Sequence, residues 1–151
     1  MKKSNQIILQ LNELLVINYN VEKIYLDVLN KVESENLKHF FRAMAFERSE
    51  FCRFLGAEII QKGGKPDYSE SSSQNTTDLW ANNLIYILST KDEYAIIGAV
   101  CTIKSWSIEK YNAIIDKIMF TDNVVHLLIK QRSAITKGLS TIKANNTLIS
   151  A

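Results

Sequence analysis

Three glutamates have the residue type to bind metal ions. Glu47 and Glu50 are three positions apart, so on a helix they project from the same face. Glu22 lies near the middle of an earlier helical segment. Carboxylates from neighbouring helices hold paired iron ions in some bundles. One hypothesis is therefore a di-iron carboxylate protein, an oxidoreductase or an iron-handling protein, with Glu22, Glu47 and Glu50 as ligands.

The two histidines do not complete such a metal site. Di-iron bundles add a Glu-x-x-His motif on each of two helices, but Asn36 and Asn123 stand three positions before His39 and His126. We expect both histidines to be partly exposed helix residues. The pattern therefore favours a protein without bound metal or another cofactor.

Polar residues also interrupt the apolar face of each predicted long helix near its midpoint. They are Asn18 with nearby Glu22, Glu47, Lys104 and Arg132. In antiparallel helices of similar length these midpoints meet at one level, and a buried carboxylate needs a cation, a metal or a proton. We predict a buried charged layer in which Glu47 meets Lys104 and Arg132. Alternatively, Glu22, Lys104 and Arg132 lie beside the faces and extend to water.

Other catalytic chemistry has little support, and we predict no catalytic residue. The two cysteines, Cys52 and Cys101, fall on helical patterns as reduced thiols, and neither has a histidine on a neighbouring turn. The glycine pair Gly63-Gly64 precedes a proline and ends a helix, whereas a phosphate-binding loop precedes one.

Composition predicts one all-α domain over residues 1–151. Hydrophobic residues make up 46% of the 151 residues, with one proline and five glycines, which is too few turn residues for a β-rich domain. The net charge of +2 does not indicate nucleic-acid binding, and no apolar run is long enough to span a membrane. Glu13 and neighbouring polar residues interrupt any signal-peptide core, so we expect a cytoplasmic protein.

Hydrophobic periodicity then gives the helices that position these residues. We predict helices over residues 4–32, 35–62, 77–88, 92–119 and 123–143. Ser34 and Asp122 are the expected N-caps of the second and last helices. Short joints give two helical hairpins, and a flexible crossover at about 67–75 separates them. The expected architecture is an antiparallel four-helix bundle with a short extra helix, and a frayed tail at about 144–151.

The order of several short motifs resembles a ferritin-like bacterial family of unknown function. They are Leu11-Asn12-x-Leu14, Tyr25, Glu47-Arg48 with Phe51, Gly63-Gly64-x-Pro66, and Tyr111. The resemblance extends from about residue 7 to 142 and implies a ferritin-like bundle.

The same resemblance implies metal-binding positions that this chain has replaced. The family is acidic where this chain has Cys101 and Lys104, and has acidic and histidine positions near Ile129 and Leu139. The resemblance thus implies a degenerate metal site in this protein.

The sequence is compatible with three interpretations of the protein's function. The first is a non-enzymatic structural or protein-interaction domain, and the second is the di-iron protein described above. The third is a basic binding module, because the chain after Asp122 has no acidic residue and contains Lys130, Arg132, Lys137 and Lys143. The expected partners are another copy of the chain or an acidic protein that binds the basic last helix, rather than nucleic acid or a membrane.

Overall fold

Five helices account for most of the chain in a computed structural model that describes residues 2–69, 74–118 and 123–147. They are α1 (Lys2–Leu29), α2 (Glu35–Gln61), α3 (Gln74–Thr90), α4 (Glu93–Lys117) and α5 (Val124–Asn145). No strand occurs in these described ranges, so the all-α prediction is confirmed. Within the same ranges, no helix is long and apolar enough to cross a membrane.

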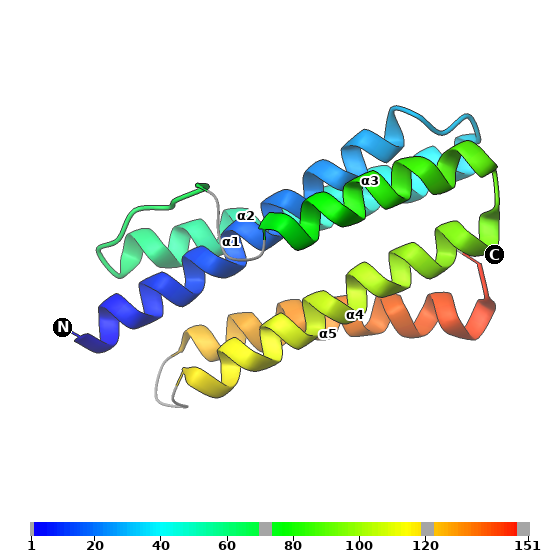
Figure 1. Ribbon diagram of the computed structural model, residues 1–151. Helices are drawn as coiled ribbons and strands as arrows, with labels where there is room; N and C mark the ends of the chain where they lie inside the picture. Colours follow the sequence, from blue (N-terminus) through cyan, green and yellow to red (C-terminus); the bar gives the residue numbers. More distant parts are fainter. Residues whose placement is uncertain (1, 70–73, 119–122, 148–151) are drawn as a thin grey trace.

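Helix α1 is the central element of the structure. It packs along α2, and it also contacts α3 and α4. Figure 1 shows α1, α2 and α3 on one side and the α4–α5 hairpin on the other. Residues 14–18 of α1 are all buried, as expected for a helix with neighbours on several sides.

Local capping signals set both ends of α2. The Ser34 hydroxyl accepts a hydrogen bond from the Leu37 amide at 3.3 Å, which confirms the predicted N-cap. At the other end Gly63 has φ +87°, and the Gly63 and Gly64 amides bond back to Ile60 and Ile59. This Schellman arrangement satisfies the last carbonyls of the helix.

The predicted crossover at 67–75 is described only in part. Asp67 is attached to α1, because its amide donates to the Asn12 side chain at 2.8 Å, and Asn12 in turn donates to the Lys65 carbonyl at 3.1 Å. Residues 74–75 already belong to α3, while residues 70–73 lie outside the described residues, as does Asp122. The predicted frayed tail, residues 144–151, begins inside α5, which ends at Asn145. Residues 148–151 also lie outside the described residues.

The buried face of α2 differs from the predicted one by a rotation of about one residue. The sequence predicted Glu47 on the buried face, but Glu47 is half-buried, and Phe54, which lies seven residues further along the same face, is 46% exposed. The buried face instead consists of Phe41, Ala45, Arg48, Phe51, Cys52, Leu55, Gly56 and Ile59. This difference places Arg48 where the sequence had suggested Glu47.

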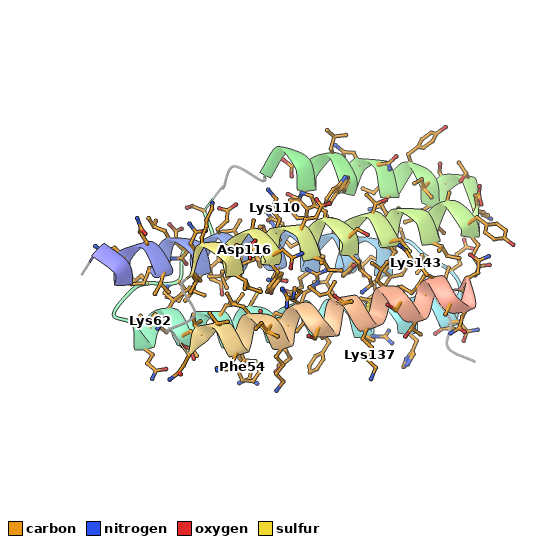
Figure 2. All side chains as sticks on the ribbon, turned by 90° about the horizontal axis from the view of Figure 1, so that it is seen from below. Phe54, Lys62, Lys110, Asp116, Lys137 and Lys143 are labelled. Carbon is orange, nitrogen blue, oxygen red and sulfur yellow. The ribbon has the colours of Figure 1, made fainter. Side chains whose placement is uncertain are left out.

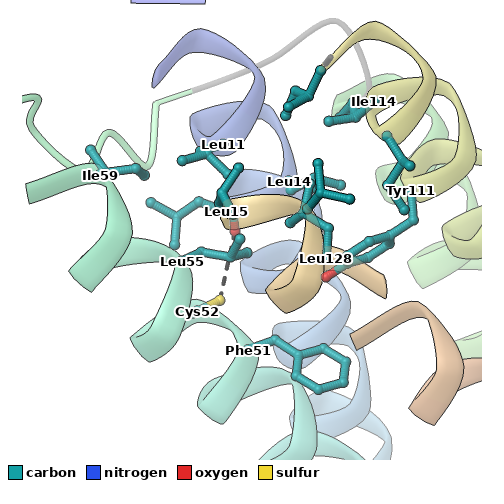
Figure 3. Packing of buried hydrophobic residues seen from close by; sticks show 14 of the residues in the cluster. Leu11, Leu14, Leu15, Phe51, Cys52, Leu55, Ile59, Tyr111, Ile114 and Leu128 are labelled. Carbon is teal, nitrogen blue, oxygen red and sulfur yellow. Dashed lines mark hydrogen bonds between the residues drawn. The ribbon is translucent and has the colours of Figure 1, made fainter. Parts of the chain in front are cut away.

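The apolar core consists of two clusters along the helices. One contains Leu11, Leu55 and Leu128, and Figure 3 shows its packing, with Tyr111 at one side of the cluster. The other contains Val21, Phe41 and several residues of the first half of α4. On α1, α2 and α4 the change from one cluster to the other occurs at a buried polar residue.

Candidate functional site

A buried hydrogen-bond network connects α1, α2, α4 and α5 between the two apolar clusters. Arg48 Nη1 donates to Asn18 Oδ1 at 2.9 Å, and Arg48 Nη2 donates to Ser107 Oγ at 3.1 Å. Asn18 Nδ2 donates to Tyr111 Oη at 2.9 Å, and Tyr111 donates to Gln131 Oε1 at 2.6 Å. We call these five residues, one or two from each helix, the central network.

Backbone carbonyls complete the central network at three points. Asn18 Nδ2 also donates to the Leu14 carbonyl at 2.9 Å, and Ser107 Oγ donates to the Ile103 carbonyl at 2.9 Å. Gln131 Nε2 reaches the Phe51 carbonyl at 3.3 Å, which joins α5 to α2. Each polar side chain therefore has partners inside the protein, as a buried group requires.

Arg48 is the unusual member, because its charge is buried without an acidic partner. The side chain has 0% exposure, and in the described part of the chain no carboxylate oxygen lies within the 4.0 Å limit of an ion pair. Among the described residues, neither its Nε nor the buried Tyr25 hydroxyl has a hydrogen-bond partner of regular geometry, although the two side chains lie near each other. Burial raises the pKa of Tyr25, while the nearby Arg48 charge partly opposes that rise.

Lys104 places a second cation close to the first. It is 1% exposed, and its Nζ donates to Met44 Sδ at 3.2 Å. Burial lowers its pKa from 10.5 to about 8, with a further contribution from the positive charge of Arg48, against an opposing effect from Glu47. A thioether is a weak acceptor and an ammonium has three donors, so Lys104 is poorly satisfied.

A groove between α2 and α5 ends on this lysine. It has a volume of about 590 Å³. Its walls come from α2, including Phe40, Met44 and Glu47, and from α5, including Ala134, Lys137, Gly138 and Ile142. Lys104 is the lining residue that α4 supplies among those described, and because it is buried it forms the floor. A Cβ at Gly138 would lie 3.4 Å from Lys104 Nζ, so the backbone of α5 passes close to the ammonium.

The structure brings together only some of the residues predicted for the charged layer. Asn18 and Lys104 are buried, whereas Glu22, Glu47 and Arg132 are half-buried. Arg132 donates to Asn112 Oδ1 at 2.8 Å. Glu47 lines the groove with Lys104 but makes no ion pair with it within 4.0 Å.

The three glutamates of the metal hypothesis face different surroundings. Glu22 lies with Tyr19, Cys52 and Tyr68 in a second groove, away from the groove that Glu47 lines. Glu50 pairs with Arg53 at 2.7 Å, which holds the pKa of the Glu50 carboxyl below its usual value. Among the described residues, no group of three or more histidine, cysteine, aspartate or glutamate side chains is placed to hold a metal ion.

The cysteines and histidines add no reactive group. Both cysteines are free thiols; Cys52 donates to the Leu15 carbonyl at 3.6 Å, and burial raises its pKa to about 12. Such a thiol is a poor nucleophile at neutral pH. His39 and His126 are exposed.

Sequence reasoning missed Arg48, Ser107 and Gln131 as buried polar residues. A signal existed for Arg48, because it is the one polar residue on the stripe Phe41, Ala45, Arg48, Cys52, Leu55 and Ile59, with alternating steps of four and three. The face predicted from the sequence, which includes Glu47, also includes Glu58, so it has two charged residues and is less apolar than the stripe with Arg48. No comparable signal separates Gln131 from Arg132.

Tyr111→Phe tests the central network. The change leaves Gln131 Oε1 and one Asn18 N–H without their partner, and we expect it to lower the free energy of unfolding by about 1–3 kcal/mol in denaturant melts. The control is Tyr94→Phe, at a tyrosine that is 73% exposed on the same helix. Equal, small losses for the two variants would contradict a buried network.

Lys104→Met tests the buried ammonium through pH. The unfolded chain keeps the lysine proton up to about pH 10.5, while the native protein releases it near pH 8, so wild-type stability should rise between these values. Relative to Lys104→Met, the gain should be on the order of 3 kcal/mol. Lys117→Met, at an exposed lysine of α4, should leave the wild-type pH profile unchanged. Parallel profiles for the wild type and Lys104→Met would show that the ammonium reaches water.

Comparison with known proteins gives one match. The family model described as a domain of unknown function (DUF2383) matches residues 6–117, which include four of the five central-network residues. Helix α5, with Gln131, lies beyond the matched range. No curated protein and no solved structure shows significant similarity to the chain. Since the model matches well over half of the sequence, the chain belongs to the DUF2383 family.

Proposed function

We propose that this protein is a non-enzymatic, ferritin-like helical bundle that binds a ligand in the groove between α2 and α5. The observation that supports this most directly is the groove itself, about 590 Å³ in volume, with a lining surface that is mainly apolar and a buried lysine at its floor. Ligand sites are concave and mainly apolar, usually about 300–1,000 Å³, with a few placed polar groups.

The chemistry of the central residues also supports a degenerate metal site. Arg48 and Lys104 supply only hydrogen-bond donors and positive charge, which repel a metal cation. Asn18, Ser107, Tyr111 and Gln131 are already engaged with one another or with the backbone. The residues at the centre therefore do not fit a pair of iron ions.

A second candidate function is docking of an acidic protein on α5. Lys130, Lys137 and Lys143 are exposed, and the helix contains no acidic residue that would neutralise them. Figure 2 shows the positions of Lys137 and Lys143 along α5. A second copy of the chain is the other partner we consider for this helix.

Metal analysis distinguishes the proposal from the di-iron alternative. After aerobic incubation with Fe(II) and desalting, we expect the protein to retain no stoichiometric iron, because Glu22 and Glu47 face different grooves and Glu50 is paired with Arg53. Retention of two iron ions per chain, lost in Glu47→Gln, would support the alternative instead.

Binding of the neutral fluorescent dye Nile red tests the groove. We expect saturable binding to the wild type and weakened binding to Thr141→Trp, because Thr141 lines the groove and tryptophan would fill it. Thr136→Trp is a matched control: both threonines are exposed on α5 and donate to the carbonyl four residues earlier at 2.9 Å, but Thr136 does not line the groove. Equal binding by both variants, or none by the wild type, would contradict the proposal.

A further inference from the structure

We propose that the ligand of the α2–α5 groove is a long-chain carboxylate, with its head group on Lys104 and its apolar chain between the two helices. This inference rests on the proposed function and specifies the chemical class of the ligand.

The head-group site is a buried cation that lacks an anion. Lys104 is 1% exposed and lines the groove, and among the described residues the hydrogen-bond partner of its Nζ is the weakly accepting Met44 sulfur at 3.2 Å. No carboxylate of the described residues lies within 4.0 Å of it. A ligand carboxylate would give the ammonium the charged acceptor that the protein itself does not provide.

The α5 residue next to the ammonium is Gly138, which lines the groove together with Lys104. A Cβ at this position would lie 3.4 Å from Lys104 Nζ, so the backbone of α5 passes close to the ammonium. Gly138 lies in the middle of α5 and has a negative φ, so the backbone conformation does not require glycine there. Without a side chain at residue 138, a larger α5 side chain does not occupy the groove beside the buried lysine.

The walls beyond the lysine suit an alkyl chain. Phe40 and Met44 on one side and Ile142 on the other are apolar, and the lining on α2 extends from Glu47 to Asn36. The eight steps along the helix from Met44 back to Asn36 correspond to about 12 Å. The groove is therefore elongated, and its surface is mainly apolar, although His39, Lys137 and Thr141 also line it. Its charged end lies inside, and its polar end, at Asn36 and Asn145, lies near the helix termini.

Charge favours a monoanion as the head group. Arg48 lies behind Lys104 closely enough to lower the lysine pKa, and Lys137 lines the groove, so the local charge is positive. Glu47 also lines the groove, and its negative charge raises the pKa of Lys104. Lys137 is exposed and screened by water, so the buried excess is that of Arg48 and Lys104 over Glu47, which is one positive charge. A monoanion matches this excess, whereas a phosphate dianion would exceed it and would experience more repulsion from Glu47.

The experiment compares decanoate with decanol, which has the same chain without the charge, by displacement of bound Nile red. For the wild type we expect decanoate to bind about tenfold more tightly than decanol. Lys104→Met should abolish this preference while retaining decanol binding. Glu47→Gln, at a half-buried position that should fold normally, should strengthen decanoate binding because it removes the opposing carboxylate. Lys117→Met should behave as wild type.

The outcomes separate this inference from the proposed function. If decanol binds the wild type as tightly as decanoate, and Thr141→Trp weakens both, the groove binds ligands but the carboxylate assignment is wrong. If decyl phosphate binds more tightly than decanoate, the head group is a phosphate and the inference is also wrong. If a polyglutamate peptide displaces the dye and decanoate does not, the groove accepts an acidic protein segment. If neither decanoate nor decanol binds, the proposed function itself fails.

Discussion

A guanidinium group without access to water needs acceptors in several directions, and Arg48 finds them on two other helices. Its hydrogen bonds to Asn18 and Ser107 fix the distance and rotation of α1 and α4 relative to α2. Tyr111 and Gln131 continue the chain of hydrogen bonds to α5. If one helix rotated, its buried polar side chains would lose their partners on the other helices, at a cost of about 1–3 kcal/mol for each group. The hydrogen bonds therefore disfavour alternative rotations of all four helices. The apolar clusters on either side supply burial, and the central network determines which faces of the helices meet.

The same network has a consequence for the neighbouring lysine. Arg48 raises the positive potential at the centre of the molecule, and Lys104 lies near it with almost no exposed surface. Two buried cations with one half-buried glutamate nearby leave an excess of positive charge. Proteins usually offset such an excess with an acid, a shifted pKa or a bound anion. Here the pKa of Lys104 is lowered, and the groove that Lys104 lines has room for a bound anion as well.

Helix packing explains why the groove lies between α2 and α5. Helix α1 contacts three other helices and so draws α2, α3 and α4 around itself, while α5 packs along α4. The α4–α5 hairpin meets the other helices where α4 contacts α3 and α1. A groove lies between α2 and the α5 side, lined by residues within 36–47 and 134–147. The residues that would close this groove are small, namely Ala43, Ala134 and Gly138. A binding surface therefore results from the same arrangement that buries the central network.

Local sequence determined the all-α class and both ends of α2, because a cap depends on residues within one turn of it. Ser34 and Gly63 have the conformations and hydrogen bonds that their residue types predict. The start of α5 differs from the expectation, because its N-cap position is Asn123, one residue after Asp122, and no side-chain hydrogen bond caps it. Sequence also identified Asn18 and Lys104 as polar residues within apolar stripes. It did not determine which of two stripes on α2 faces inward, since adjacent residues differ by only about 100° in direction and both stripes are largely apolar. Tertiary contacts decided this: the partners of Arg48 are 30 and 59 residues away in the chain, so no local pattern contains them.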